Sequence, residues 1–88
     1  MYVILVYDVD ERRVQKVCKF LRRYLNWVQN SVFEGELTEA RLEAIRNGLL
    51  KRIDPGQDSV FIYTTRSQRV VRKQVLGVEA MPTDNLVA

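Results

Sequence analysis

The sequence has no histidine and only one cysteine, and each shortage excludes a kind of chemistry. Cys18 has no second thiol to pair with, so an intramolecular disulfide and a cysteine metal cluster are excluded. We expect it to be a small core residue on the apolar side of a helix. Without an imidazole, Ser-His and Cys-His schemes cannot operate within this chain. A water activated by a metal that carboxylates hold remains for hydrolysis at neutral pH.

The sequence also lacks a long apolar run. No stretch approaches the roughly 18 apolar residues that a membrane-spanning helix needs, and no signal peptide is recognisable. We therefore expect a cytoplasmic protein with no membrane partner. A domain of 88 residues is only marginally stable by itself, which favours association with a second subunit.

The most informative pattern that is present is a strand ending in carboxylates. Six apolar or aromatic residues with high β propensity, Tyr2 to Tyr7, run directly into Asp8-Val9-Asp10. The run predicts a central strand that is covered on both faces. Acids at the end of such a strand are typical of a metal site or a catalytic group, and equally of a turn or a helix cap. Asp10 stands at the N-cap position of the helix that follows.

Apolar periodicity in the rest of the sequence predicts two helices and several strands. One helix spans about 11–25, and the second begins after a Thr38 cap and is broken by Asp54-Pro55-Gly56. Gly48 inside the second helix costs up to about 1 kcal/mol relative to alanine, which indicates close packing there. We expect the other strands at 27–37 with a bulge or bend at Gly35, at 58–65, at 74–78 and, as a short tail, at 85–88.

This order of elements indicates a ferredoxin-like β-α-β-β-α-β sandwich of the α+β class. Residues 1–80 form the domain and residues 81–88 form a C-terminal tail. Two helices cover one face of the sheet, whereas the first strand is apolar on both sides, so the other face needs cover as well. We expect a homodimer in which two sheets stack and the tail pairs with the partner's sheet edge.

Positive charge gathers in two segments, although the net charge is only +3. Such clusters suit a polyanion, because phosphate contacts release counterions, and a merely solvated helix face and loop is the alternative. The clusters comprise Arg12, Arg13, Lys16, Lys19, Arg22 and Arg23 in the first segment, and Arg66, Arg69, Arg72 and Lys73 in the second.

Several segments together closely resemble the CRISPR-associated protein 2 family. They are Tyr7-Asp8-Val9, the basic helix behind it, the Gln-Asn-Ser-Val-Phe-Glu-Gly-Glu-Leu run of 29–37, the Asp-Ser-Val-Phe-Ile-Tyr run of 58–63, and Leu76-Gly77. The resemblance covers nearly the whole chain. It implies a ferredoxin-like homodimer of a prokaryotic CRISPR-Cas defence system. Members of the family have been assigned metal-dependent cleavage of RNA or duplex DNA. They also act with the CRISPR-associated integrase during spacer acquisition.

The resemblance implies that Asp8 is both the catalytic residue and the metal ligand. Its two copies face each other across the dimer axis and share a divalent cation, usually Mg²⁺. One carboxylate per subunit suffices, because Mg²⁺ keeps several of its waters. An acid that accepts backbone N–H groups at a turn is the alternative interpretation of Asp8.

Four further residues are candidates for a supporting role at this site. Asp10 either caps its helix or joins the metal site, and Tyr7 either positions Asp8 or simply packs. Ser31 and Phe33 match a family segment near the active cleft, although a core or interface role suits Phe33 as well.

The resemblance also singles out basic residues for nucleic-acid binding. Some family members carry arginine where this chain has Val14 and Trp27, so Arg12, Arg13 and Lys16 are the candidates to contact phosphates here. Two hypotheses follow from the resemblance. The protein is a magnesium-dependent endonuclease, or it is a non-catalytic dimeric nucleic-acid scaffold for the integrase.

Overall fold

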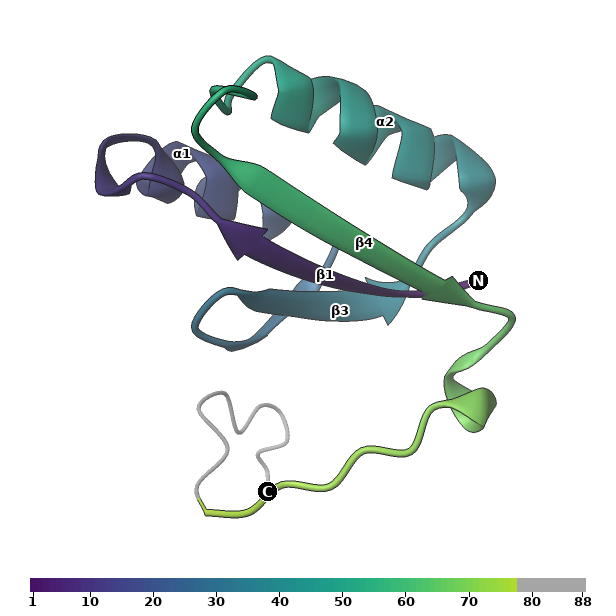
Figure 1. Ribbon diagram of the computed structural model, residues 1–88. Coiled ribbons are helices and arrows are strands. Elements are labelled where there is room, and N and C mark those ends of the chain that lie inside the picture. The colour runs from purple at the N-terminus through teal and green to yellow at the C-terminus, as the bar shows by residue number, and fades with distance from the viewer. Residues whose placement is uncertain (78–88) are drawn as a thin grey trace.

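Four antiparallel strands form one sheet, and two helices cover one of its faces (Figure 1). The computed structural model describes residues 1–77. Along the chain lie β1 (Tyr2–Asp8), α1 (Glu11–Leu21), β2 (Asn26–Gln29), β3 (Val32–Glu36), α2 (Glu39–Leu50), β4 (Ser59–Thr65) and the short 3₁₀ helix η1 (Gln68–Val70). The sheet order β2-β3-β1-β4 puts β1 in the interior, so the predicted ferredoxin-like fold is confirmed.

The side chains of β1 alternate between the two faces of the sheet. Val3, Leu5 and Tyr7 point toward the helices and are buried, whereas Ile4 and Val6 lie on the opposite face, called here the open face. Leu5 pairs with Phe33 on one side and Ile62 on the other, so the core continues across the sheet. The helices and loops complete this core with Val17, Phe20, Leu21, Leu25, Leu37, Leu42, Ile45 and Leu49.

The open face carries an apolar ladder toward β4. Val6 is opposite Phe61, and Ile4 is opposite Tyr63. The Phe61 and Tyr63 side chains are 55% and 57% exposed, which is unusual for large aromatic residues that stand side by side. The side of this face that lies over β4 is therefore a solvent-exposed apolar surface.

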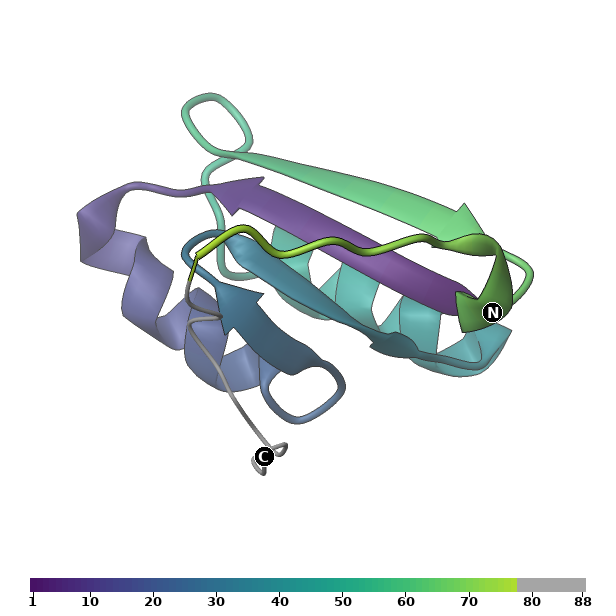
Figure 2. The same ribbon diagram turned by 90° about the horizontal axis from the view of Figure 1, so that it is seen from below.

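The chain after β4 turns back beneath the sheet and runs along the open face, away from the helices (Figure 2). Residues 71–76 border a groove whose other wall includes Ile4, Val32 and Glu34. Lys73 Nζ lies 3.0 Å from Glu34 Oε2 and ties the segment to β3. The segment therefore covers the β3 side of the open face and leaves the β4 side exposed.

The predicted single strand over 27–37 is wrong, because the chain reverses at Asn30 and Ser31. β2 and β3 form a hairpin in which Gln29 pairs with Val32. Ser31 adopts a positive φ of 71°, which only a few per cent of non-glycine residues do. The turn therefore lacks the glycine that normally marks such a position in a sequence.

The predicted bulge or bend at Gly35 is also wrong. Gly35 pairs regularly with Val3, and the irregularity lies in β2, between Trp27 and Gln29. A Cβ on Gly35 would lie 3.2 Å from Leu25 Cδ2, which is tighter than ordinary contact. A side chain at this position would therefore require Leu25 to shift.

Two further predictions differ from the structure, and a third is not tested by it. α1 ends at Leu21, and residues 22–24 form turns that still bring Leu25 into the core. The predicted strand at 74–78 is absent over residues 74–77, where the chain is irregular and Gly77 has a φ of 94°. The predicted tail strand at 85–88, and with it the proposed pairing of residues 81–88 with a partner, lies outside the described residues.

The close packing that Gly48 indicated is confirmed, since the ring of Phe20 occupies the place that a Cβ on Gly48 would take. Gly48→Ala should therefore destabilise the protein by about 1–3 kcal/mol through overpacking. Helix propensity alone would make the alanine variant more stable by about 1 kcal/mol. Urea unfolding at equal protein concentration measures the difference.

Gly56→Ala is the matched control, because a Cβ there meets only Asp54 Oδ1, at an ordinary 3.4 Å. Its stability should change by less than about 1 kcal/mol. A Gly48→Ala variant at least as stable as the original chain would show that the Phe20 contact does not constrain the helix pair.

Candidate functional site

Asp8 ends β1 with its side chain in solvent. It pairs with Ser59 of β4 and continues the open-face register of Ile4 and Val6. Within residues 1–77 its carboxylate makes no hydrogen bond or ion pair, and in particular it accepts no backbone N–H group. This disfavours the alternative of a turn-capping acid. Asp8 presents two carboxylate oxygens to solvent from a fixed position at the end of a strand.

Asp10, two residues further, has a carboxylate that is fully engaged locally. Its Oδ1 accepts the Arg12 backbone N–H at 2.8 Å and Arg12 Nε at 2.9 Å, and its Oδ2 accepts Arg12 Nη2 at 3.3 Å. The hydrogen bonds from the Arg12 side chain and backbone lower the pKa of Asp10. The predicted helix cap is confirmed.

Asp58, immediately before β4, is the buried acid of this region. Arg13 donates to it through Nε at 2.7 Å on Oδ2 and through Nη2 at 3.0 Å on Oδ1. The backbone N–H groups of Asp10 and Asp54 complete the set at 3.0 and 2.8 Å. The Asp58 side chain is 1% exposed and the Arg13 side chain 18%.

These four hydrogen bonds join the β1–α1 loop to the α2–β4 loop. The Arg13 guanidinium holds the pKa of the Asp58 carboxyl well below its usual range, and the two backbone donors act in the same direction. We call the Arg13–Asp58 ion pair with its two backbone donors the clamp. Since Asp8 pairs with Ser59, the clamp lies directly beside the strand end that carries Asp8. Asp58 therefore fixes the backbone on which the candidate ligand stands.

Tyr7 and Phe33 lie on the other side of the sheet from Asp8, in the core. The Tyr7 hydroxyl is 3.1 Å from Cys18 Sγ, and its ring centroid is 5.9 Å from that of Phe33. Burial raises the pKa of Tyr7 to about 12, and the contact with Cys18 adds to the shift. Tyr7 is therefore neutral and packs beneath the sheet, and neither ring reaches the Asp8 side chain.

Ser31 is brought close to the site by the main chain. Its carbonyl oxygen accepts the Tyr7 backbone N–H at 2.9 Å, which extends the β1–β3 pairing to the residue before Asp8. The hairpin turn therefore borders the end of β1 on one side, as the loop before β4 does on the other.

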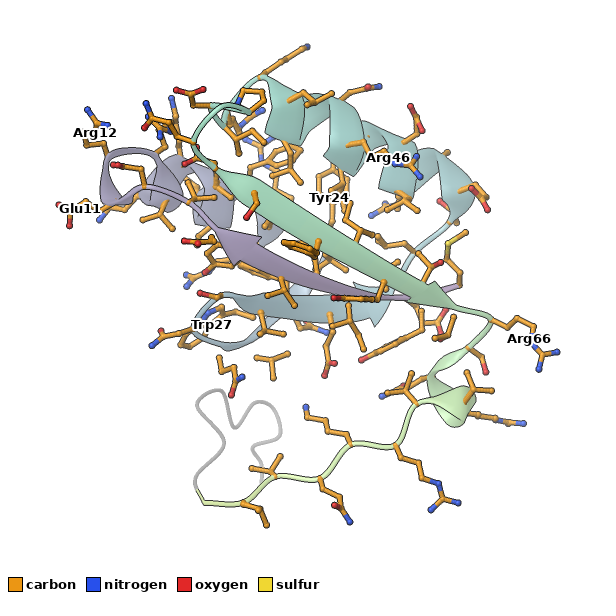
Figure 3. All side chains as sticks on the ribbon, viewed as in Figure 1. Glu11, Arg12, Tyr24, Trp27, Arg46 and Arg66 are labelled. Carbon is orange, nitrogen blue, oxygen red and sulfur yellow. The ribbon has the colours of Figure 1, made fainter. Side chains whose placement is uncertain are left out.

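The three cations predicted to contact phosphates differ in their availability. Arg12 is bound to Asp10, although its side chain is 70% exposed and extends from the start of α1 beside Glu11 (Figure 3). The guanidinium of Arg13 is committed to Asp58 and largely buried. Lys16 is exposed and has no ion pair within the described residues. Arg12 and Lys16 are thus the two that face solvent.

The donor set at the strand end suits a hard cation held by few protein ligands. No group of three or more His, Cys, Asp or Glu side chains that could hold a metal occurs in residues 1–77. Asp8 by itself offers one oxygen ligand group, which is compatible with Mg²⁺, because this ion keeps most of its water shell. The same residues include no helix long and apolar enough to cross a membrane.

Residues 1–73 match the family model described as CRISPR associated protein Cas2. The chain belongs to the Cas2 family. A relative from Methanocaldococcus jannaschii, named CRISPR-associated endoribonuclease Cas2, is 51% identical over 87 residues, which cover 99% of this chain and 76% of the relative. A relative of the same name from Pyrococcus furiosus is 53% identical over 87 residues, which cover 99% of this chain and 100% of the relative.

Solved structures of Cas2 proteins share the fold as well. A crystal structure of cas2 aligns with a TM-score of 0.86 at 43% identity, covering 96% of this chain and 94% of that one. The crystal structure of Streptococcus pyogenes Cas2 at pH 6.5 aligns with a TM-score of 0.72 at 34% identity, covering 85% and 100%. The family resemblance carried by the sequence motifs is confirmed.

Sequence reasoning missed Asp58 in this Cas2 chain, where the pattern predicts only the start of a strand. The available signal is Arg13, which shares a stripe of α1 with the buried Val17 and Phe20 at i+4 and i+7. A guanidinium on such a stripe needs an acid partner. The pattern does not say which acid, because Asp58 is 45 residues away.

Asp58→Asn should weaken the acid sensitivity of the fold. The ion pair holds the native pKa below the unfolded value of about 3.9, so its stabilisation is complete above about pH 4. It is lost as the pH falls from there toward the native pKa. The amide has no such titration and leaves the Arg13 charge unpaired. The melting temperature should therefore fall by more than about 10 °C at pH 7 and vary less below pH 4.

Thermal unfolding followed by circular dichroism from pH 2 to 7 measures both effects. Glu11→Gln is the control, since it removes an exposed acid of the same helix and should reproduce the original pH profile. Parallel profiles for Asp58→Asn and the original chain would contradict this account of the clamp.

Proposed function

We propose that this protein is a divalent-metal-dependent endoribonuclease of a CRISPR-Cas system, in which Asp8 from each of two subunits holds one cation, usually Mg²⁺. The observation that carries the proposal is the uncommitted carboxylate of Asp8 at the end of the central strand. The relatives named CRISPR-associated endoribonuclease Cas2, about half identical over nearly the whole chain, support the reaction class.

The three acids of this region have separable roles in the proposed site. Asp8 is the ligand, Asp10 holds the start of α1, and Asp58 fixes the loops on either side. When bound, Mg²⁺ lowers the pKa of a coordinated water and stabilises negative charge on a phosphate. Tyr7 is neutral and buried, so within residues 1–77 the Asp8 carboxylate is the group at this strand end that could accept a proton from a metal-bound water.

The proposed site needs a second copy of the chain, and the open face offers the surface for it. Phe61 and Tyr63 form an exposed apolar patch on the same face of the sheet as Asp8, two and four residues along β4 from its partner Ser59. Stacking two such faces would bury the patch, which the hydrophobic effect favours. A two-fold axis near this end of the sheet brings the two Asp8 carboxylates together.

Asp8→Asn is expected to lower Mg²⁺-dependent RNA cleavage by at least about 100-fold, because an amide binds the cation poorly. Folding and dimerisation should be retained, since the Asp8 carboxylate makes no hydrogen bond or ion pair within residues 1–77. Cleavage of labelled single-stranded RNA and of duplex DNA, with Mg²⁺ and with EDTA, gives the measurement. It also shows which of the two polymers is the substrate.

Asp10→Asn is the matched control, because asparagine caps a helix as well as aspartate does. It should keep cleavage within a few-fold of the original rate. Equal cleavage by Asp8→Asn and the original chain would refute the enzyme proposal, and so would loss of cleavage in Asp10→Asn alone.

The second candidate function is a non-catalytic dimeric scaffold that holds nucleic acid for the CRISPR-associated integrase in spacer acquisition. The exposed cations of α1, Arg12 and Lys16 among them, favour nucleic-acid binding whether or not the protein cuts. Purified protein that binds RNA or DNA but never cleaves with Mg²⁺ or Mn²⁺ would support this candidate over the enzyme.

Phe61→Lys should disrupt the dimer, since it places a charge in the apolar patch. Sedimentation velocity at about 10 μM should show a monomer, and metal-dependent cleavage should disappear because each site then has one carboxylate. Leu50→Lys is the control, as Leu50 is an equally exposed apolar residue, but on α2. A dimeric, active Phe61→Lys variant would exclude stacking through this face.

A further inference from the structure

A small basic groove lies between α1 and the turn after α2, in the helical layer of the molecule. It is separate from Asp8 and from the open face of the sheet. Its walls are four cationic side chains and one aromatic ring: Lys16, Lys19, Phe20, Arg23 and Arg52.

Phe20 forms the floor of this groove and contacts two of its four cations, Arg23 and Arg52. The ring is buried against Gly48, and the Arg52 guanidinium carbon lies 4.2 Å from its centroid. Arg52 Nη1 also donates to the Gly48 carbonyl oxygen at 2.9 Å. The Arg23 guanidinium carbon is 5.9 Å from the same ring centroid. Stacking on an aromatic face leaves the edge of a guanidinium free to donate hydrogen bonds to an anion.

The positive charge of the groove is not balanced within the described residues. No carboxylate lines it, and none of its four cations forms a salt bridge in residues 1–77. The other charged side chains near the start of α1 behave differently, since Arg12 and Arg13 are both paired with acids. Four cations without an acid partner repel each other around one hollow. An anion that enters it lowers this repulsion and is bound favourably.

The cations are arranged in a row. Lys16 and Lys19 lie one helical turn apart on α1 (i, i+3), about 4.5 Å along the axis, and Arg23 follows in the turn after the helix. The rise between the two lysines is comparable to the axial spacing of about 3.4 Å per charge along one strand of a duplex. Arg52 adds a second side to the row, and its planar fork suits a phosphate oxygen pair.

We propose that this groove binds the phosphodiester backbone of a nucleic acid strand, without reading its sequence. The choice of a nucleic acid over another polyanion rests on the proposed function, whereas the anion site itself rests on the four cations and the Phe20 floor. The groove holds no group placed to read base edges, so the contact contributes affinity and position only.

The test compares two variants that each remove two positive charges. Lys19→Gln with Arg23→Gln changes the groove, whereas Arg41→Gln with Arg46→Gln changes exposed arginines of α2 outside it (Figure 3 labels Arg46). Binding of a fluorescein-labelled 20-nucleotide RNA is followed by anisotropy in EDTA, so that no cleavage interferes, over a series of KCl concentrations.

The groove variant should weaken RNA binding roughly tenfold at 0.1 M KCl and reduce the slope of log K against log salt by about 1.4, from about 0.7 per lost phosphate contact. The α2 variant should keep the original slope. Arg52→Ala should weaken binding, and Arg52→Lys should restore it only in part because the stacked fork is lost.

Three outcomes would overturn the proposal. These are an unchanged salt slope in the groove variant, an equal loss in the α2 variant, and displacement of RNA from the groove by an oligo-glutamate peptide at matched charge. Circular dichroism of each variant excludes unfolding as the cause. Because binding is measured without metal, failure of Asp8-dependent cleavage would leave this result standing, and the two proposals fail separately.

Discussion

The ion pair between Arg13 and Asp58 is the interaction on which the site end of this fold depends. It connects the first turn of α1 to the loop that starts β4, and the Asp10 and Asp54 N–H groups fill the remaining acceptor positions of the carboxylate. A buried carboxylate is tolerated only when its charge and lone pairs are satisfied in this way. The backbone on both sides of Asp8 and Ser59 is thus fixed by one acid that itself faces no solvent.

Three aspartates within reach of this clamp show how environment assigns roles to one residue type. Asp58 is buried and has four donors, and Asp10 is bound to Arg12 and its own helix. Asp8, in contrast, ends the strand with no partner in the described residues. Opposite charges and N–H donors stabilise an ionised acid but occupy its oxygens. Among these three, Asp8 is the acid that such donors leave unoccupied, and it is therefore the one we propose as the ligand of a cation.

Sequence patterns predicted most of the fold, and the failures share a physical cause. Apolar spacing in α1 and α2 and the apolar run of β1 report local burial, which the structure confirms. The hairpin at Ser31 was not predictable in this way, because a serine there adopts a conformation that usually requires glycine. Gly35 packs closely against Leu25, and Asp58 is bound by Arg13, and neither partner is a neighbour in the sequence. Long-range partners decide such positions, and local composition does not reveal them.

The protein has two surfaces of different chemistry. The open face is apolar near Phe61 and Tyr63, and it leads to Asp8, whereas the cationic groove lies in the helical layer. If two sheets stack through the open face, the helices of both subunits remain on the outside, with one groove each. A nucleic acid can then be held by phosphate contacts on the helices while its cleavage depends on the strand ends. Under these two proposals, binding and cleavage rest on different side chains, so a substitution should remove one and spare the other.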